Sequence, residues 1–236
     1  MILNGHVRQE STIETLVAAV VGDRLAAPGL DEEWWPNGEP PQAAFEARCR
    51  ARVARHLDRL PGRCRHALLS HLRTEQQAPL LDAWVANPGA LTLALGGDVG
   101  VGKTYAAAAV ANAVAALRLR VDPHIRPVAW WTVAGLLDAL RRDQDDTVWT
   151  EAREAALLVL DDLAHTRPTE WAVERLWMLI DHRVSNGMRQ VVTSNADWQV
   201  LTATWGAGTM DRLSEDAVFV RLTGSSLRGA ITLDPR

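Results

Sequence analysis

The fold of this chain is decided by the segment Gly97-Asp98-Val99-Gly100-Val101-Gly102-Lys103-Thr104. A short apolar run, residues 91–95, comes directly before it, and a long alanine-rich stretch follows it at once. The pattern G-x-x-x-x-G-K-[ST] between a strand and a helix predicts a phosphate-binding loop, or P-loop. Glycines let the backbone curl around phosphate oxygens with its amide groups pointing inward, and the N-terminus of the following helix favours an anion.

Two side chains of this loop have expected roles on a nucleoside triphosphate. Lys103 is the only lysine of the chain, and its ammonium group should reach the β- and γ-phosphates, a task for which arginine is no chemical equivalent. The hydroxyl of Thr104 should bind Mg²⁺. The sequence therefore predicts that residues 97–104, with the adjoining Tyr105, bind ATP and Mg²⁺.

A metal-bound triphosphate also needs a carboxylate on a second strand. The apolar run 157–160 ends in Asp161 and Asp162. We expect Asp161 to hold Mg²⁺, directly or through water, and Asp162 to polarise the attacking water. A helix-capping pair after an ordinary buried strand is the structural alternative, which the preceding P-loop makes less favourable.

Further polar residues follow later elements. Asn195 ends the run Val192-Thr193-Ser194-Asn195, where strand ends line the ligand crevice of a parallel sheet, although a turn-forming asparagine would look the same. Arg212 and Arg228 stand near the end of the sequence. Either arginine can neutralise a γ-phosphate, in the same chain or from a neighbouring subunit, and either can instead be solvated.

From residue 90 onward, short apolar runs alternate with longer amphipathic ones, which is typical of βα units around a parallel sheet. The expected strands are residues 91–95, 128–131, 157–160, 191–193 and 230–233. The expected helices between them are residues 103–119, 133–142, 169–186 and 210–215. Before residue 90 we expect helices over residues 13–21, 42–60 and 63–76 and a short turn over 79–86, with a Pro- and Gly-containing break at 28–41.

Composition limits the class of protein. The 236 residues are 47% hydrophobic, enough to bury a substantial core, and no stretch is long and apolar enough for a membrane span. The first ten residues lack a secretory pattern, and only Cys49 and Cys64 are present, so we expect a cytoplasmic protein without a zinc site. A net charge of −4 means that any nucleic-acid surface must be local.

The order of these motifs resembles the DnaC/IstB group of AAA+ ATPases, which includes bacterial and phage helicase loaders and the ATPases of certain transposons. The resemblance covers about the last two-thirds of the chain. It implies an α/β fold, namely an AAA+ P-loop NTPase with a central parallel sheet flanked by helices, a minimal lid or none, and a small helical N-terminal region. The matching residues are the P-loop with the run 105–113, Asp161-Asp162, Thr193-Ser194-Asn195, Asp211-Arg212-Leu213 and the final Gly-x-Ser-x-Arg ending at Arg228.

The resemblance also implies roles for single residues. Asn195 is similar to the sensor-1 residue, Arg212 to the arginine finger offered to the ATP of a neighbour, and Arg228 to the sensor-2 arginine acting on the same chain's nucleotide. Asp162 stands where loaders often have glutamate, and the shorter carboxylate predicts slow basal turnover. Leu227 stands where an aromatic residue is common.

By the same resemblance, the leading hypothesis is an ATPase that loads or remodels a hexameric, DnaB-like replicative helicase. Residues 1–75 would form the partner-binding region and residues 76–236 the ATPase domain. ATP would bind at interfaces of a self-associated oligomer, and single-stranded DNA would be a second partner. The alternatives are a transposition ATPase that assembles on DNA and recruits a transposase, and a nucleotide-gated adaptor with little hydrolysis.

Several residues outside these motifs are candidate contacts. Arg48, Arg52, Arg55 and Arg59 align on one face of the expected helix over residues 42–60, as a solvated face or a surface for nucleic acid. Arg141 and Arg142 lie in the region that, by the resemblance, touches single-stranded DNA. The pair Trp34-Trp35 in an acidic stretch is either a partner anchor or packed on its own domain. Trp171 and Trp177 are core or subunit-contact candidates.

Overall fold

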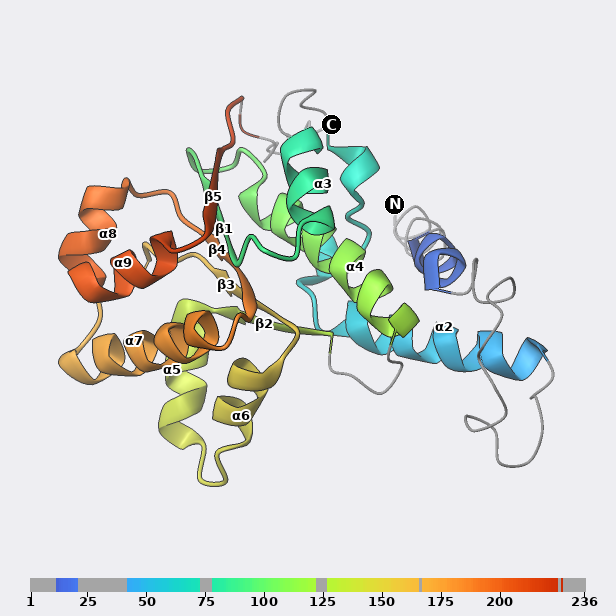
Figure 1. Cartoon of the computed structure of the whole chain (residues 1–236), viewed down its shortest axis with the longest axis horizontal. Helices are drawn as coiled ribbons and strands as arrows, with labels where there is room; N and C mark the ends of the chain where they lie inside the picture. Colours follow the sequence, from blue (N-terminus) through green and yellow to red (C-terminus); the bar gives the residue numbers. More distant parts are fainter. Residues whose placement is uncertain are drawn as a thin grey trace, which may run out of the picture.

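A computed structural model describes residues 12–20, 42–72, 78–121, 127–165, 167–224 and 226 of the chain. These residues form an α/β structure with one parallel sheet between two layers of helices (Figure 1). The predicted fold class is therefore confirmed.

The described strands are short and all parallel. They lie in the order β2-β3-β4-β1-β5, so the first strand is flanked by the fourth and the fifth. Parallel strands are covered on both faces, which explains why β3 is an apolar run that is buried throughout. The strands are β1 (Thr92–Gly96), β2 (Val128–Thr132), β3 (Leu157–Asp161), β4 (Arg189–Thr193) and β5 (Ala217–Arg221).

The two faces of the sheet support two separate cores. Leu157 and Val159 of β3 belong to the core beneath α4, while Leu158 and Leu160 belong to the core beneath α7. This alternation follows from the two-residue period of a strand. Helix α4 (Lys103–Val121) covers the first face, and the second is covered by α5 (Val133–Arg142), α6 (Thr147–Glu154), α7 (Glu170–Ser185), α8 (Trp198–Trp205) and α9 (Ala207–Ser214) (Figure 1).

The N-terminal elements pack on α4 rather than standing apart from it. They are a helix over residues 12–20, α2 (Gln42–Asp58), two 3₁₀ turns, η3 (Gly62–Cys64) and η4 (Leu69–His71), and α3 (Ala78–Ala86). Val53 and Leu57 of α2 are buried in the same core as α4. The division at residue 75 stays a prediction, and this packing shows which surface joins the two regions.

One polar contact ties the same regions together. Asn112 on α4 is fully buried; its amide Nδ2 donates to the carbonyl of Ala67 (2.7 Å) and, less closely, to that of Arg65 (3.4 Å). His56 of α2 lies 2.8 Å from Asn112 Oδ1. The backbone of residues 65–67 therefore hydrogen-bonds to a side chain of α4, where a continuing helix would use its own amide groups.

This contact corrects one predicted element. The helix expected over residues 63–76 is wrong in its described part, which forms η3 and η4 instead. Residues 73–76 lie outside the described residues. The sequence pattern favours a helix here, but the carbonyl groups of Arg65 and Ala67 accept hydrogen bonds from Asn112 instead, and this tertiary contact outweighs the local preference.

In the C-terminal half, several observed elements also differ from the predicted ones. The expected strand 230–233 lies outside the described residues. Strand β5 was not predicted: its run Ala-Val-Phe-Val-Arg has only five residues and closely follows the short helix expected over residues 210–215. Helices α6 and α8 were also missed, since each has only eight residues. The helices expected over residues 133–142 and 169–186 are confirmed within one residue at each end.

A buried arginine fixes the end of α6. Arg183 of α7 is fully buried, and its guanidinium donates to the carbonyls of Ala152, Arg153 and Ala155 at 2.8, 2.9 and 3.1 Å, and to that of Arg189 at 2.5 Å. Burial lowers its pKa to about 10, so the group stays charged at neutral pH. A cation at the C-terminus of a helix is also favoured by the helix dipole.

Candidate nucleotide-binding site

The loop between β1 and α4 has the backbone geometry that the glycine pattern predicts. Gly97, Gly100 and Gly102 have φ values of 137°, 90° and 98°, which side-chain-bearing residues rarely adopt. A Cβ on Gly97 would also meet the carbonyl oxygen of Leu222 at 2.2 Å. Backbone shape therefore favours glycine at all three positions, and close packing also requires it at Gly97.

Two residues that follow β5, Leu222 and Ser226, lie directly against this loop. A Cβ on Gly100 would be 2.2 Å from Ser226 Oγ, so the two residues are in close contact. Ser226 is the serine of the Gly-x-Ser-x-Arg motif that begins at Gly224. Arg228 lies outside the described residues, and only its neighbour Ser226 is placed at the loop.

Lys103 points back into the loop from the first turn of α4. Its Nζ donates to the carbonyl oxygens of Gly97 (2.8 Å) and Asp98 (2.7 Å). The backbone thus curls around the ammonium group. Phosphate oxygens of a nucleotide would enter the same cradle and take over as acceptors for this cation.

Thr104, Asp161 and Thr193 meet where α4 begins and where β3 and β4 end. Thr104 Oγ1 lies 3.1 and 3.2 Å from the two carboxylate oxygens of Asp161 and donates to them. Thr193 Oγ1 donates to Asp161 Oδ1 over 2.6 Å. Burial raises the pKa of Asp161 above its ordinary value, and the two threonine hydrogen bonds act in the opposite direction by stabilising the carboxylate.

This arrangement fits the ligand preference of Mg²⁺. The hydroxyl of Thr104 and the carboxylate of Asp161 are adjacent oxygen donors, and Mg²⁺ is usually held by one or two such groups together with substrate phosphates and water. Within the described residues, no group of three or more His, Cys, Asp or Glu side chains could hold a metal by itself. The described Cys49 and Cys64 are free and buried.

Asp162 has a left-handed backbone conformation, and its carboxylate contacts His165 rather than a threonine. Its φ of 65° lies in the left-handed region, and its amide N–H donates to Thr193 Oγ1 at 2.9 Å. Its carboxylate Oδ1 lies 3.1 Å from His165 Nδ1. Thr193 therefore connects the two aspartates, accepting from the backbone of one and donating to the carboxylate of the other.

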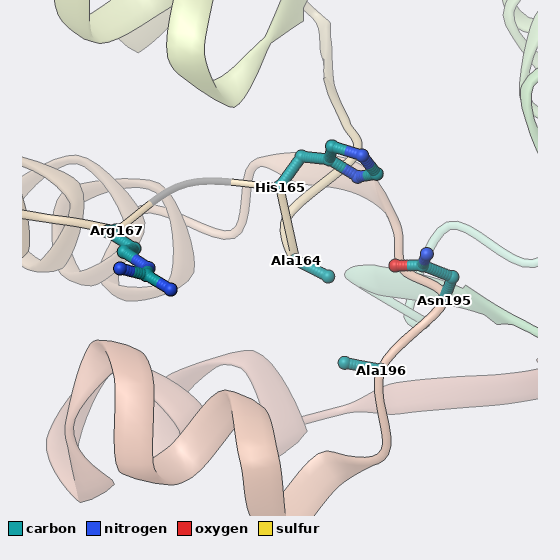
Figure 2. Close-up of a pocket in the computed structure, with 5 residues that line it drawn as sticks. All are labelled: Ala164, His165, Arg167, Asn195 and Ala196. Atoms are coloured by element: carbon teal, nitrogen blue, oxygen red, sulfur yellow. The ribbon is translucent and has the colours of Figure 1, made fainter.

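Asn195 is exposed at the end of β4 and borders a hollow of about 430 Å³. Figure 2 shows its amide directed toward Ala164 and His165, and Arg167 lines the same hollow from the segment after β3. The structure thus brings His165, the partner of Asp162, and Asn195 to one opening.

A second cavity, also about 430 Å³, joins Asn195 to the start of the P-loop. It lies at the ends of β1, β4 and β5, and Gly97 and Asp98 line it together with Asn195. The aromatic pair Trp198 and Phe219, with ring centroids 4.9 Å apart, also lines it. Asn195 therefore shares a cavity with the first residues of the P-loop, and its role as sensor 1 stays a prediction.

Arg212 lies elsewhere. Its helix α9 packs on α7 and α8, on the face of the sheet away from α4 (Figure 1). Its Nε donates to Asp181 Oδ1 (2.8 Å) and its Nη1 to Glu215 Oε2 (2.9 Å). The hydrogen bond with Glu215, followed by the charge of Asp181, raises the pKa of Arg212.

Tyr105 points from α4 toward the N-terminal elements. Its hydroxyl lies 3.2 Å from His71 Nδ1, and its ring meets His66 edge-on at a centroid distance of 5.7 Å. A direct contact of Tyr105 with the nucleotide stays a prediction.

The remaining loop residues differ in exposure, since Val99 is 59% exposed while Val101 packs against Gly97.

Three residues at the site, Thr193, His165 and Ser226, had no role predicted from the sequence. Thr193 could have been found, because a hydroxyl at the end of a buried strand next to β3 must lie beside Asp161. His165 and Ser226 had no such signal. Their contacts depend on where the rest of the fold places the residues that follow β3 and β5.

Residues 81–232 match the family described as IstB-like ATP binding protein. The chain belongs to this family. Its membership supports nucleotide binding at the P-loop and agrees with the resemblance to the DnaC/IstB group. A comparison with curated proteins gave no match.

The fold of this IstB-like chain is similar to that of several solved structures. DnaI has a TM-score of 0.60 at 23% identity, covering 74% of this chain and 100% of that one. The DnaC helicase loader has a TM-score of 0.55 at 21% identity, covering 66% and 97%. A primosome component assigned in Streptococcus pyogenes serotype M3 has a TM-score of 0.58 at 22% identity, covering 74% and 98%. These likenesses confirm the AAA+ fold.

No helix among the described residues of this IstB-like chain is both long and apolar enough to cross a membrane.

Proposed function

We propose that this protein is a cytoplasmic ATPase that loads or remodels a hexameric replicative DNA helicase. One observation carries the ATPase part: Lys103, Thr104 and Asp161 come together at the strand ends, with Thr104 Oγ1 3.1 Å from Asp161. A magnesium–triphosphate complex requires an ammonium group for its phosphates and a hydroxyl and a carboxylate for its metal ion. Mg²⁺ held by Thr104 and Asp161 would neutralise phosphate charge.

In this proposal hydrolysis needs two chains. Asp162 and Asn195 act on the attacking water from the same subunit, and Arg228 acts on the same chain's nucleotide. Arg212 stabilises the charge on the ATP of a neighbour. The position of α9, on the opposite face of the sheet from α4, supports a role in trans and hence an ATP-bridged oligomer.

A basic and aromatic cluster supports contact with single-stranded DNA. Arg141 lies 5.0 Å above the ring of Trp171, and Arg175 lies within 6 Å of the rings of both Trp149 and Trp171. Arginines stacked on tryptophans offer charge to phosphates and flat surfaces to bases. The ion pair of Arg142 with Asp138 makes Arg142 the less available member of the predicted pair.

The helicase would be bound by residues 1–75. Support comes from the likeness to a structure named as a helicase loader and from the packing of this region on α4, the helix that begins in the P-loop. Of the four arginines expected on one helix face, Arg59 directly follows α2 and pairs with Glu151 of α6 at 3.6 Å. The pair Trp34-Trp35 lies outside the described residues.

The sole lysine allows a direct test of nucleotide binding. An amine-reactive reagent can modify Lys103 and the terminal amine only. ATP with Mg²⁺ should protect Lys103, as read from the mass of the peptide that contains it. Equal modification with and without ATP would contradict the site. Lys103→Ala should abolish ATP binding, measured with a fluorescent ATP analogue.

The partner is tested by co-purification with the host's replicative helicase. An ATP-dependent complex with the helicase that Lys103→Ala weakens supports the loader function.

A transposition ATPase is the second candidate function, and the IstB-like family match favours it. ATP turnover stimulated by double-stranded rather than single-stranded DNA, without a helicase complex, would decide for it. Negligible turnover under all conditions would instead indicate the nucleotide-gated adaptor.

A further inference from the structure

Arg212 is held by two carboxylates from two helices. Asp181 of α7 accepts from Nε at 2.8 Å, and Glu215, just after α9, accepts from Nη1 at 2.9 Å. These bonds fix the guanidinium plane from two directions. Within the described part of the chain, Nη2 has no hydrogen-bond partner, so its two N–H groups remain available.

Stability does not account for this arrangement. The side chain of Arg212 is 38% exposed, and those of Asp181 and Glu215 are 30% and 51% exposed. Exposed ion pairs contribute little to folding, because water screens them and ordering two side chains costs entropy. The geometric consequence is larger: a long side chain is restricted to a single orientation with one free nitrogen.

The surroundings of this arginine have the character of a contact surface. Trp177 and Met178 precede Asp181 on α7 by one turn and are 42% and 39% exposed. Large exposed apolar side chains beside an oriented arginine are typical of protein interfaces. Next to Trp177, Glu174 and Gly208 line a hollow of about 450 Å³.

We propose that Asp181 is a positioning residue for Arg212, holding its Nη2 toward the γ-phosphate of ATP bound to a neighbouring copy of this chain. Glu215 supports the same orientation from the side of Nη1. The inference rests on the proposed role of Arg212 in trans and adds the residue that directs it. Correct orientation matters because a displacement of about 1 Å in a catalytic group can reduce a rate about a hundredfold.

Mixed oligomers separate the two halves of each interface. Lys103→Ala chains bind no ATP but still offer Arg212, and Arg212→Ala chains bind ATP but offer no arginine. Each variant alone should be inactive, and a 1:1 mixture should hydrolyse ATP. Asp181→Ala is then added to either chain, with Asp181→Asn as a conservative variant that keeps one acceptor oxygen for Nε.

The expected result is asymmetric. Asp181→Ala on the Lys103→Ala chain should lower the turnover of the mixture about tenfold or more, with the KM for ATP unchanged. Asp181→Asn on that chain should retain most of the turnover. Asp181→Ala on the Arg212→Ala chain should cause no such loss, because no arginine is present there to orient.

Other results of the mixing experiment would contradict either the role of Arg212 in trans or the positioning role of Asp181. A mixture no more active than its components would contradict the proposed role of Arg212 in trans, and the inference with it. An active mixture that is insensitive to Asp181→Ala on the donating chain would overturn the inference alone. Equal losses on both chains would indicate a structural role for Asp181 and overturn it as well. Asp58→Ala, which breaks the ion pair with Arg65 at 3.1 Å, is the matched control for removing an exposed carboxylate.

Discussion

The imidazole Nε2 of His56 and the amide Oδ1 of Asn112 lie 2.8 Å apart, and this contact joins α2 to the P-loop helix α4. Because Asn112 Oδ1 is an acceptor, His56 donates from Nε2. Within the described residues, His56 Nδ1 is buried without a hydrogen-bond partner. Protonation would place a second N–H in an interior that offers it no acceptor.

This environment predicts a loss of stability in mild acid. Burial lowers the pKa of His56 from 6.5 to about 4. A depressed folded-state pKa contributes stability above pH 6.5 that is lost as the pH falls toward 4, in total about 3 kcal/mol. Urea unfolding between pH 7 and pH 4.5 should show this loss, and His56→Gln, which donates without titrating, should show less of it. Equal pH dependence in both proteins would contradict the assignment.

Thr193→Val should impair hydrolysis more than binding. The change keeps the side-chain shape but removes the hydroxyl that donates to Asp161 and accepts from the Asp162 amide. Loss of such a supporting contact typically lowers activity about 10- to 100-fold. We expect a fall of that size in steady-state ATP turnover, with ATP affinity changed less than about threefold. Thr202→Val, which removes a hydroxyl bonded within α8, is the matched control. Equal losses from both substitutions would count against a role specific to Thr193.

Gly100→Ala should reduce nucleotide affinity. The φ of 90° is strained for alanine, and the new Cβ would lie 2.2 Å from Ser226 Oγ. Strain of about 1 to 3 kcal/mol corresponds to a loss of roughly 5- to 150-fold if it falls on the bound loop. Equilibrium titration with a fluorescent ATP analogue measures it. Gly62→Ala meets no atom within 4 Å and should bind normally; normal affinity in Gly100→Ala would show that the loop tolerates a Cβ.

Arg183→Met should strongly destabilise the fold. Methionine fills a similar volume but leaves the four carbonyls that accept from Arg183 without their donor in a buried site. Disrupting a buried charged network typically costs about 3 to 5 kcal/mol of unfolding free energy. Urea denaturation measures the change. Arg118→Met, on an exposed position of α4, should change stability by less than about 0.5 kcal/mol. A small effect at Arg183 would mean that these carbonyls find other donors.

Local sequence patterns were enough to predict several parts of this protein. The P-loop, the aspartates after β3 and the long helices were predictable, because glycine spacing, apolar runs and helical periodicity act over a few residues. The same pattern located Lys103, Thr104 and Asp161 at one edge of the sheet, since parallel strands end on the same side.

Contacts between side chains far apart in the sequence were not predictable and depend on the packed fold. Thr193 joins Asp161 to Asp162, Asn112 takes the carbonyls that an expected helix would have used, and Asp181 orients Arg212. Each contact links segments far apart in sequence, so no local period predicts it. The strand order that places β4 between β3 and β1 brings Thr193 beside Asp161 and brings Asn195 to the cavity that Gly97 also lines. The choice of which hydroxyl or carboxylate meets which partner is made by packing across the sheet, where a few tenths of an ångström separate a hydrogen bond from none.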